Sequence, residues 1–295
     1  MPELPEVEIT TRRLSAAIAG ADVESVMAPG MVAVKSVSPP LSALAERRIE
    51  GLWRVGKMPV VDFAHADRGA AEASGGEEAL SLLVHLMSAG RLQLFDNRAS
   101  LKDRRSRVLI RLDGGRELRL REFGTKQRAW VRLMASEAIA AEQMVATLGP
   151  EAWPAPPLGE LERALDQPRH LHPLLRDQRA IAGIGRSWVD EILWEARLSP
   201  FKKGADLDSE EVSRLYDALS ILDQAIAHYE QVVGETIPDK LPMPLKVHRR
   251  QGEPCPRCGA TLEAVHYAEY VMSYCPAEQT EGRVLKDRRL SRLLK

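Results

Sequence analysis

The sequence predicts a two-domain α+β protein, with an N-terminal helix and antiparallel β-sandwich followed by a helical domain that ends in a cysteine-bearing β-hairpin. Three observations support this prediction. Short runs with a period of two residues fill the stretch from Val23 to about Leu133, as expected for strands. Apolar residues at helical spacing come next, and all three cysteines of the 295-residue chain lie between Cys255 and Cys275.

The first predicted element is a helix within "ELPEVEITTRRLSAAIAG". Pro5 suits a first helical position, and Gly20 suits the stop at the other end. A partial apolar stripe would face the core, formed by Val7, Leu14, Ala17 and Ile18. Pro2 then stands just ahead of the helix.

The predicted strands are "VVDF", "LLVHL", "RLQLF", "RVLIRLDGGRELRLREF" and "RAWVRLM". The "DGG" between Leu112 and Arg116 is a strong hairpin signal. Many short antiparallel strands are typical of a sandwich or barrel. The Gly- and Ala-rich stretch 66–79 indicates a loop insertion.

A Pro-rich joint at 150–160 marks the predicted domain boundary, and the pattern after it is helical. One helix carries Trp188, and a second spans roughly 209–230 with Asp208 or Ser209 as its cap. The predicted organisation is a β-sandwich domain, a helical domain, a cysteine-bearing hairpin and a basic tail, at residues 1–150, 151–245, 246–280 and 281–295.

Composition limits the class of protein. Apolar residues make up 44% of the chain, which argues against disorder throughout, and the net charge of −1 indicates no partner. No apolar run approaches the roughly 18–20 residues of a membrane span, and no signal peptide is evident, so we expect a cytoplasmic protein. From Lys240 to Lys295 there are eleven basic residues against six acidic ones, which indicates either a nucleic-acid surface or a solvated tail.

The cysteine spacing indicates a metal site. Cys255, Cys258 and Cys275 supply three of the four ligands of a zinc finger, and the fourth cysteine would fall at Glu278. Zinc accepts carboxylate and imidazole, so Glu278 or His266 could complete the site. The alternative is a metal-free hairpin held together by packing.

The chain opens with "MPELPEVE". If Met1 is removed, Pro2 carries a free amine whose ordinary pKa, about 7.7–8.0, leaves far more free base near neutrality than a lysine with a pKa of about 10.4. Such an amine can attack a carbonyl or sugar carbon and form a Schiff base. Glu3 and Glu6 can move protons beside it. Alternatively, these glutamates only complement the helix dipole.

"PELPEVE" resembles the start of the Fpg/Nei family of DNA glycosylases, the formamidopyrimidine-DNA glycosylase and endonuclease VIII group. Later segments resemble the family in the same order. They are "RVGKMPVVDF", "LLVHLMSAGRL", "LGPE", "LLRDQRAIAGIGRSWVDEILWEARLSP" and "RRQGEPCPRCG". The resemblance covers most of the chain except 66–79 and about 280–295.

The resemblance implies a bifunctional DNA glycosylase and AP lyase of base excision repair, acting as a monomer on oxidised bases in duplex DNA. Pro2 would be the nucleophile, Glu3 the general acid and base, and Glu6 a supporting residue. Lys57 would contact a phosphate or a sugar oxygen. Residues 151–245 would form a helix–two-turn–helix DNA-binding domain, and the cysteines a zinc finger.

The sequence departs from the family at DNA-contacting positions. Arg186, which follows Gly185 at a predicted helix start, replaces the usual asparagine, and Tyr270 falls near the arginine of the finger hairpin. A helix N-terminus with a nearby arginine can still bind phosphate. The hairpin tyrosine carries no charge, so we expect weaker DNA binding.

The loop 122–130 also departs from the family. The family places there an arginine and an aromatic that fill the gap left by a flipped base. The candidates here are Lys126, Gln127 and Arg128, with Met87 or Ser88 from another loop. These departures leave open a DNA-binding relative with reduced or no glycosylase activity, and more remotely an enzyme acting on a carbonyl outside nucleic acids.

Overall fold

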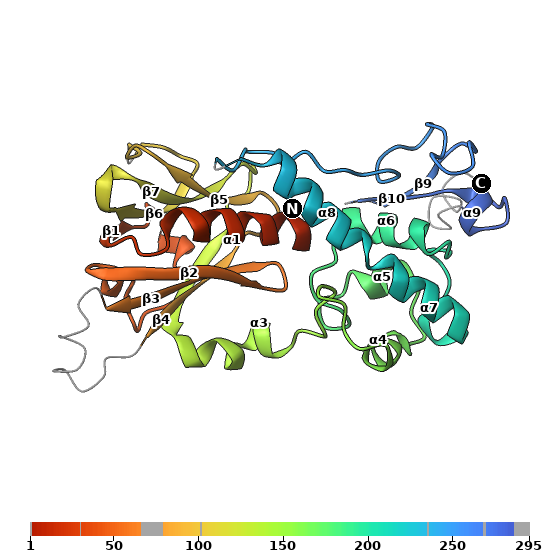
Figure 1. The fold of residues 1–295 in the computed structure, drawn as a ribbon, viewed down its shortest axis with the longest axis horizontal. Coiled ribbons are helices and arrows are strands. Elements are labelled where there is room, and N and C mark those ends of the chain that lie inside the picture. The colour runs from red at the N-terminus through yellow and green to blue at the C-terminus, as the bar shows by residue number, and fades with distance from the viewer. Residues whose placement is uncertain are drawn as a thin grey trace. The chain divides into compact units, whose positions relative to one another are not determined.

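The computed structural model describes residues 2–29, 31–65, 79–100, 102–234, 236–267 and 270–285. The chain forms two compact units, one of Met1–Thr147 with Ile226–Pro242 and one of Leu148–Ala225 with Met243–Lys295 (Figure 1). The predicted insertion at 66–79, except residue 79, and the predicted basic tail from residue 286 onward lie outside the described residues. Among the described residues, no helix has the length and apolar character needed to cross a bilayer.

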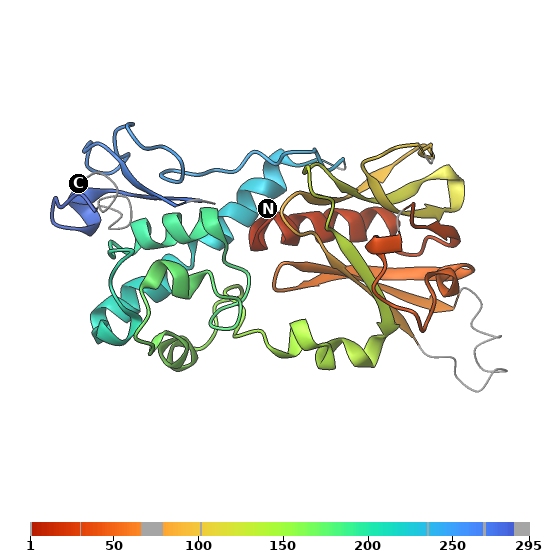
Figure 2. The ribbon, with the colours of Figure 1, turned by 180° about the vertical axis from the view of Figure 1, so that it is seen from behind.

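The first unit begins with helix α1 (Leu4–Ile18), which confirms the predicted N-terminal helix. Glu3 is its N-cap residue, Pro5 lies in its first turn, and Gly20 follows with a φ of +85°. The helix contacts β2 (Arg47–Val55) and β3 (Met58–His65) of one sheet and β5 (Gly90–Phe95) of the other. In Figures 1 and 2 the red helix runs between the orange and the yellow strands of these sheets.

Two four-stranded antiparallel sheets make up the sandwich, and each predicted strand is present. The first sheet has the order β1-β6-β7-β5, formed by Val23–Met27, Ser106–Leu112, Glu117–Glu122 and Gly90–Phe95. The second has the order β2-β3-β4-β8, formed by Arg47–Val55, Met58–His65, Leu80–His85 and Trp130–Ala135. Short 3₁₀ turns lie at η1 (Met31–Ala33), η2 (Leu41–Leu44), η3 (Asp113–Gly115) and η4 (Ser136–Ala141).

The core of this unit lies between the sheets and α1, and a later segment completes it. Tyr229, Val233, Ile237 and Leu241 are buried in the same cluster as Val7, Leu14 and Ile18 of α1. The short helix α3 (Gln143–Ala146) leads out of the sandwich toward the second unit in the chain. The division at 150, 245 and 280 inferred from sequence stays a prediction.

The second unit is helical and ends in a β-hairpin followed by a short helix, which confirms the fold class predicted from the sequence. Its helices are α4 (Leu158–Leu165), α5 (Leu171–Leu175), α6 (Arg186–Glu195), α7 (Ser209–Ala218) and the start of α8 (Ile221–Val232), with a 3₁₀ turn η5 (Gly204–Asp206). Strands β9 (Glu263–His266) and β10 (Val271–Tyr274) pair antiparallel, and the short helix α9 (Pro276–Gln279) follows.

The prediction of one helix over 209–230 is wrong, because the chain breaks between α7 and α8. At the break, the Ser220 N–H and hydroxyl both donate to the Asp217 carbonyl, at 3.1 and 2.6 Å. A serine that bonds locally in this way competes with the helical hydrogen-bond pattern. The apolar stripe misled the prediction, since Leu219 and Leu222 stay buried across the break.

Candidate functional site

The beginning of α1 gathers two buried carboxylates. Pro2 is buried and directly precedes Glu3, whose residue surface is 2% exposed. The Glu3 N–H donates to Glu6 Oε2 at 2.9 Å. The first turn of a helix leaves N–H groups without helical partners, and its dipole favours negative charge there. Formation of the helix therefore holds Glu3 and Glu6 in place directly after Pro2 in the chain.

Tyr229 on α8 holds the other oxygen of Glu6. Its hydroxyl donates to Glu6 Oε1 at 2.6 Å, and the residue is fully buried. Burial, together with the negative charge of Glu6, raises the pKa of Tyr229 well above its ordinary value, so the phenol remains a hydrogen-bond donor. Sequence reasoning missed this residue, since nothing local links position 229 to the first helix.

Lys57 lies in the tight turn between β2 and β3, after Gly56 with a φ of +56°. The lysine is half-buried. Burial, and secondarily the positive charge of Lys57, lowers the pKa of His85 below 6.5. The His85 ring stacks on Trp130 with centroids 5.2 Å apart, so a neutral imidazole is built into the sheet edge near Lys57.

Met87 occupies the turn that connects β4 to β5. Its φ of +49° is unusual for a residue other than glycine, and its N–H donates to His85 Nδ1 at 3.1 Å. Gly90 closes the turn through a bond to the Leu86 carbonyl at 2.7 Å, where an added Cβ would lie 2.4 Å from that oxygen. The turn thus presents Met87 half-buried and Ser88 exposed.

The loop after β7 exposes Lys126, Gln127 and Arg128. Gln127 is anchored, because its Nε2 donates to the Arg104 carbonyl at 2.6 Å and its Oε1 accepts from Arg107 at 3.0 Å. The anchored glutamine leaves Lys126 and Arg128 as the exposed cations of this loop.

In the second unit, Gly185 is the N-cap of α6 and Arg186 is its first residue. Gln178 shapes the loop before it. Its Oε1 accepts from the Gly183 N–H at 3.0 Å, and its Nε2 donates to the Ile184 carbonyl at 2.8 Å. Gly183 has a φ of +98°, a conformation that favours glycine. These bonds hold the N-terminus of α6 in place. The free N–H groups and the dipole of a helix N-terminus favour the binding of anions.

Tyr270 lies next to β10 within a stack of aromatic and cationic groups. Its ring stacks on Tyr267 and His172, with centroids 4.4 and 5.6 Å away. The Arg176 guanidinium lies 4.1 Å from the ring centre and that of Arg186 lies 5.7 Å from it. The structure therefore brings together two predicted residues, Arg186 and Tyr270, and adds Arg176, which sequence reasoning did not single out.

A buried carboxylate flanked by two histidines supports this stack. Asp190 Oδ2 lies 2.7 Å from His248 Nδ1 and accepts from the Ser273 N–H at 2.9 Å, while Oδ1 lies 3.2 Å from His172 Nε2. Asp190 and His172 are each 1% exposed. The network ties α5, α6 and β10 together beneath Tyr270. Its members are far apart in the sequence, so no local motif could have revealed it.

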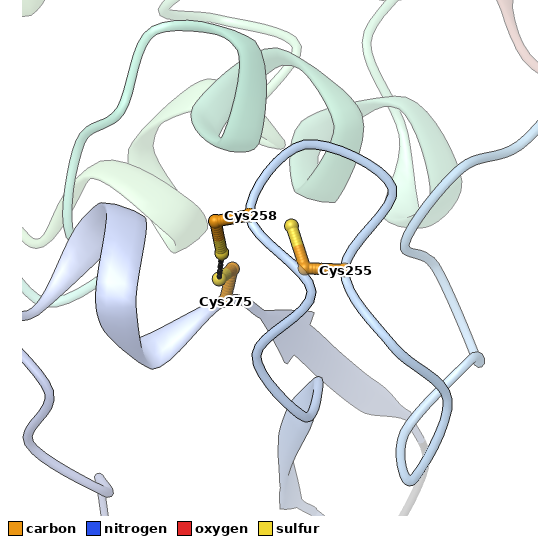
Figure 3. Close-up of side chains that lie close together, drawn as sticks. All are labelled: Cys255, Cys258 and Cys275. Atoms are coloured by element: carbon orange, nitrogen blue, oxygen red, sulfur yellow. Dashed lines mark hydrogen bonds between the residues drawn. The ribbon is translucent and has the colours of Figure 1, made fainter.

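The three cysteines converge as predicted (Figure 3). Their sulfur atoms all lie within 4.8 Å of one another, and those of Cys258 and Cys275 are 3.5 Å apart. In a tetrahedral site with Zn–S bonds of about 2.3 Å, two thiolates lie about 3.8 Å apart, so sulfur shifts of about 1 Å or less would let all three bind one zinc ion. Burial is the main cause that raises the pKa of Cys275 to about 12.

Glu278 and His266 do not join this cluster. Glu278 Oε2 lies 3.2 Å from Arg197 Nε and 3.3 Å from Arg257 Nη1. His266 is exposed at the end of β9, paired with Val271. In the described part of the chain, the group of side chains placed to hold a metal contains the thiols alone.

Comparisons with known proteins agree with this arrangement. Residues 1–126 match the formamidopyrimidine-DNA glycosylase N-terminal domain, and residues 149–235 match the H2TH domain of the same enzyme. A formamidopyrimidine-DNA glycosylase from Roseiflexus sp. is 33% identical over 94% of this chain and 98% of its own length. An uncharacterized formamidopyrimidine-DNA glycosylase-like protein from Mycobacterium tuberculosis is 40% identical over 41% of this chain and 78% of its own.

Solved structures share the fold. The Lactococcus lactis Fpg (MutM), in complex with DNA containing N7-benzyl-Fapy-dG, superposes with a TM-score of 0.80 at 24% identity, over 95% of this chain and 100% of that one. A complex of the same enzyme with DNA containing an abasic site gives 0.80 at 23% identity, with the same coverage. With two family domains spanning most of its length and a full-length relative at 33% identity, the chain belongs to the formamidopyrimidine-DNA glycosylase family of DNA-repair enzymes.

Proposed function

We propose that this protein acts as a monomer on damaged duplex DNA, removing oxidised bases and then cutting the strand as a bifunctional glycosylase and AP lyase. The family assignment supports the glycosylase activity. Its structural neighbours were captured on DNA that carries a formamidopyrimidine lesion or an abasic site. The lyase step and the identity of the nucleophile rest on the residues at the start of α1.

The nucleophile in this proposal is the Pro2 amine, freed by removal of Met1. Its nitrogen bonds to C1′ of the damaged nucleotide while the bond from C1′ to the base breaks, and the base leaves with its electron pair and a proton. The C1′–O4′ bond then opens with a proton from Glu3 on O4′, which leaves an iminium ion between the Pro2 nitrogen and C1′, the Schiff base of this proposal. Loss of a C2′ proton expels the 3′ phosphate, and a second elimination expels the 5′ phosphate.

The hydrogen bonds of Glu6 support a positioning role for it, and the position of Glu3 next to Pro2 supports a catalytic one. Glu6 uses one carboxylate oxygen for the Glu3 N–H and the other for Tyr229. A carboxylate engaged on both oxygens is suited to holding the chain start in place. Glu3, next to Pro2 and buried at the N-cap, is the candidate for proton transfer.

The remaining residues supply contacts with DNA in this proposal. Lys57 would bind a phosphate or sugar oxygen. Met87, Lys126 and Arg128 come from exposed or half-buried turns of the first unit, where they would fill or flank the gap left by a flipped base.

In the second unit, the N-cap Gly185 and Arg186 would bind the DNA backbone. Tyr270, with the Arg176 guanidinium 4.1 Å from its ring centre, would offer an aromatic edge near the position where the resemblance places the family's hairpin arginine. The three cysteines would hold a zinc ion. When bound, it would cross-link the loop before β9 to the end of β10.

The observation that carries this proposal is the hydrogen-bonded cluster of Glu3, Glu6 and Tyr229, which begins at the residue after Pro2. The test is borohydride trapping on duplexes that contain 8-oxoguanine, an oxidised pyrimidine or an abasic site. Wild type should give a covalent complex that Pro2→Gly and Glu3→Gln diminish, while Glu50→Gln, an exposed glutamate on β2, leaves it unchanged. Mass spectrometry should show that Met1 is absent. Equal trapping by Pro2→Gly would contradict the proposed nucleophile.

A second candidate function is DNA binding without base excision. Arg186 and Tyr270 favour it, because by resemblance they stand where the family has an asparagine and an arginine that contact DNA. No covalent complex on any substrate, combined with intact duplex binding, would select this alternative.

A further inference from the structure

The finger hairpin holds its first cysteine in a preformed thiolate pocket. The sulfur of Cys255 accepts N–H groups from Arg257 and Cys258 of its own turn, and the Trp194 indole N–H donates to it at 3.4 Å. The turn is closed by the Gly259 N–H bond to the Cys255 carbonyl at 2.9 Å, with Gly259 at a φ of +76°. The backbone thus shapes one half of a metal site.

The second half repeats the first with one replacement. Cys275 accepts the N–H of Glu278, the residue three positions later, as Cys255 accepts that of Cys258. Glu278 therefore stands where the backbone geometry would place a fourth ligand. Its carboxylate, however, pairs with Arg197 and Arg257.

Arg257 is fixed by contacts of its own. Its Nη2 lies 3.0 Å from a Glu195 oxygen, its Nη1 donates to the Trp194 carbonyl at 3.0 Å, and its guanidinium lies 4.0 Å from the Trp194 ring centre. The Glu278 side chain is 14% exposed. These contacts hold Arg257 in place, so it cannot move with Glu278 toward a metal ion. Coordination by Glu278 would therefore break its ion pairs with both Arg197 and Arg257.

We infer that Glu278 is withheld from the metal, and that Cys255, Cys258 and Cys275 bind it as a three-thiolate site whose fourth position is open to an exchangeable ligand. An open position is the mark of zinc sites that accept water or another small donor. Cys258 is exposed, so solvent reaches the edge of this cluster. The ligand class is a small external donor, such as water, imidazole or a thiol.

Cobalt(II) is the probe for this inference, since its visible bands report both the number of thiolates and the geometry of the site. The reduced, metal-free full-length chain is titrated with cobalt(II) and then with imidazole. Wild type should bind one equivalent, and its bands should shift when imidazole enters the fourth position. Glu278→Gln and the control Glu281→Gln, whose carboxylate pairs only with the exposed Arg283 among the described contacts, should both match wild type.

Glu278→Cys should add a fourth thiolate. We expect cobalt affinity to rise and the bands to become insensitive to imidazole, because the added thiolate fills the fourth position. Several results would overturn the inference. One is a change in the cobalt absorption bands or weaker cobalt binding in Glu278→Gln, and another is a change in the bands in His266→Gln. The others are a wild-type spectrum that imidazole does not change and failure of the wild type to bind cobalt. Circular dichroism of each variant confirms that it is folded.

Discussion

Glu6 joins residues from distant parts of the chain through its two oxygens. One accepts the backbone N–H of Glu3 and the other accepts the hydroxyl of Tyr229. Removing the hydroxyl in Tyr229→Phe leaves a buried carboxylate oxygen without its donor. Hydrogen bonds to charged groups contribute about 1.5–3 kcal/mol, so we expect the free energy of unfolding to fall by about 2 kcal/mol.

Urea denaturation measures this loss, and borohydride trapping should weaken with it. Tyr216→Phe, a half-buried tyrosine on α7, is the matched control and should change stability little. Equal losses in the two variants would show that the bond to Glu6 contributes nothing specific.

His85 makes stability depend on pH. Its folded pKa lies below 6.5 chiefly because the ring is buried, and its Nδ1 must stay unprotonated to accept the Met87 N–H. Below about pH 6.5 the unfolded chain binds a proton that the folded chain resists. This contribution to stability is therefore present above pH 6.5 and is lost as the pH falls toward the lower folded value.

Urea denaturation at a series of pH values tests this prediction with His85→Gln, which keeps an acceptor but cannot titrate. The two proteins should differ in slope by up to about 1.4 kcal/mol per pH unit below pH 6.5 and run parallel above it. Parallel curves throughout would mean that His85 does not resist protonation in the folded chain.

Among the elements, α7 shows how a local signal specifies a helix. Asp208 Oδ1 accepts the Glu211 N–H at 2.9 Å, and Glu211 Oε2 accepts the Asp208 N–H at 3.1 Å. Asp208→Ala should lower the free energy of unfolding by about 1 kcal/mol, as loss of an N-cap does. Asp166→Ala, at the C-cap of α4, is the control and should be neutral or slightly stabilising, since a carboxylate there opposes the helix dipole.

Chemical denaturation monitored by helical circular dichroism compares the two aspartate variants. The same local reasoning identified α1 from Pro5 and Gly20, and the β6–β7 hairpin from its Asp-Gly-Gly turn. It could not separate α7 from α8, because the apolar stripe continues while a single serine hydroxyl redirects the backbone. Caps and turns are encoded locally, whereas at this break the Ser220 N–H and hydroxyl both bond to the Asp217 carbonyl, which the apolar pattern does not reveal.

For the whole molecule, we expect DNA binding to depend on salt through a few arginines. Arg186→Ala should weaken duplex binding and reduce the slope of log affinity against log salt by about one. The control is Arg163→Ala, an exposed arginine of α4, which should leave the slope unchanged. Fluorescence anisotropy over a salt series measures both. An unchanged slope in Arg186→Ala would remove this residue from the phosphate contacts.

The candidate residues that sequence could predict were those carried by short motifs, such as Pro2, Glu3 and the three cysteines. Those it missed, Tyr229, Arg176 and the histidines around Asp190, acquire their roles only when distant segments pack together. The engagement of Glu278 by Arg197 and Arg257 is of the same kind. Spacing locates a ligand position, but the neighbouring charges decide what the side chain does there.

The first unit is discontinuous, since its core is completed by Ile226–Pro242. Glu6 and the Tyr229 hydroxyl that holds it are 223 residues apart in the chain. Because a ribosome releases the chain from its N-terminus, the sandwich emerges early and must wait for most of the second unit to be made before Tyr229 can reach Glu6. In a nascent or prematurely terminated chain, Glu6 therefore lacks its hydrogen bond from Tyr229. The surroundings of the proposed Pro2 nucleophile are complete only late in translation.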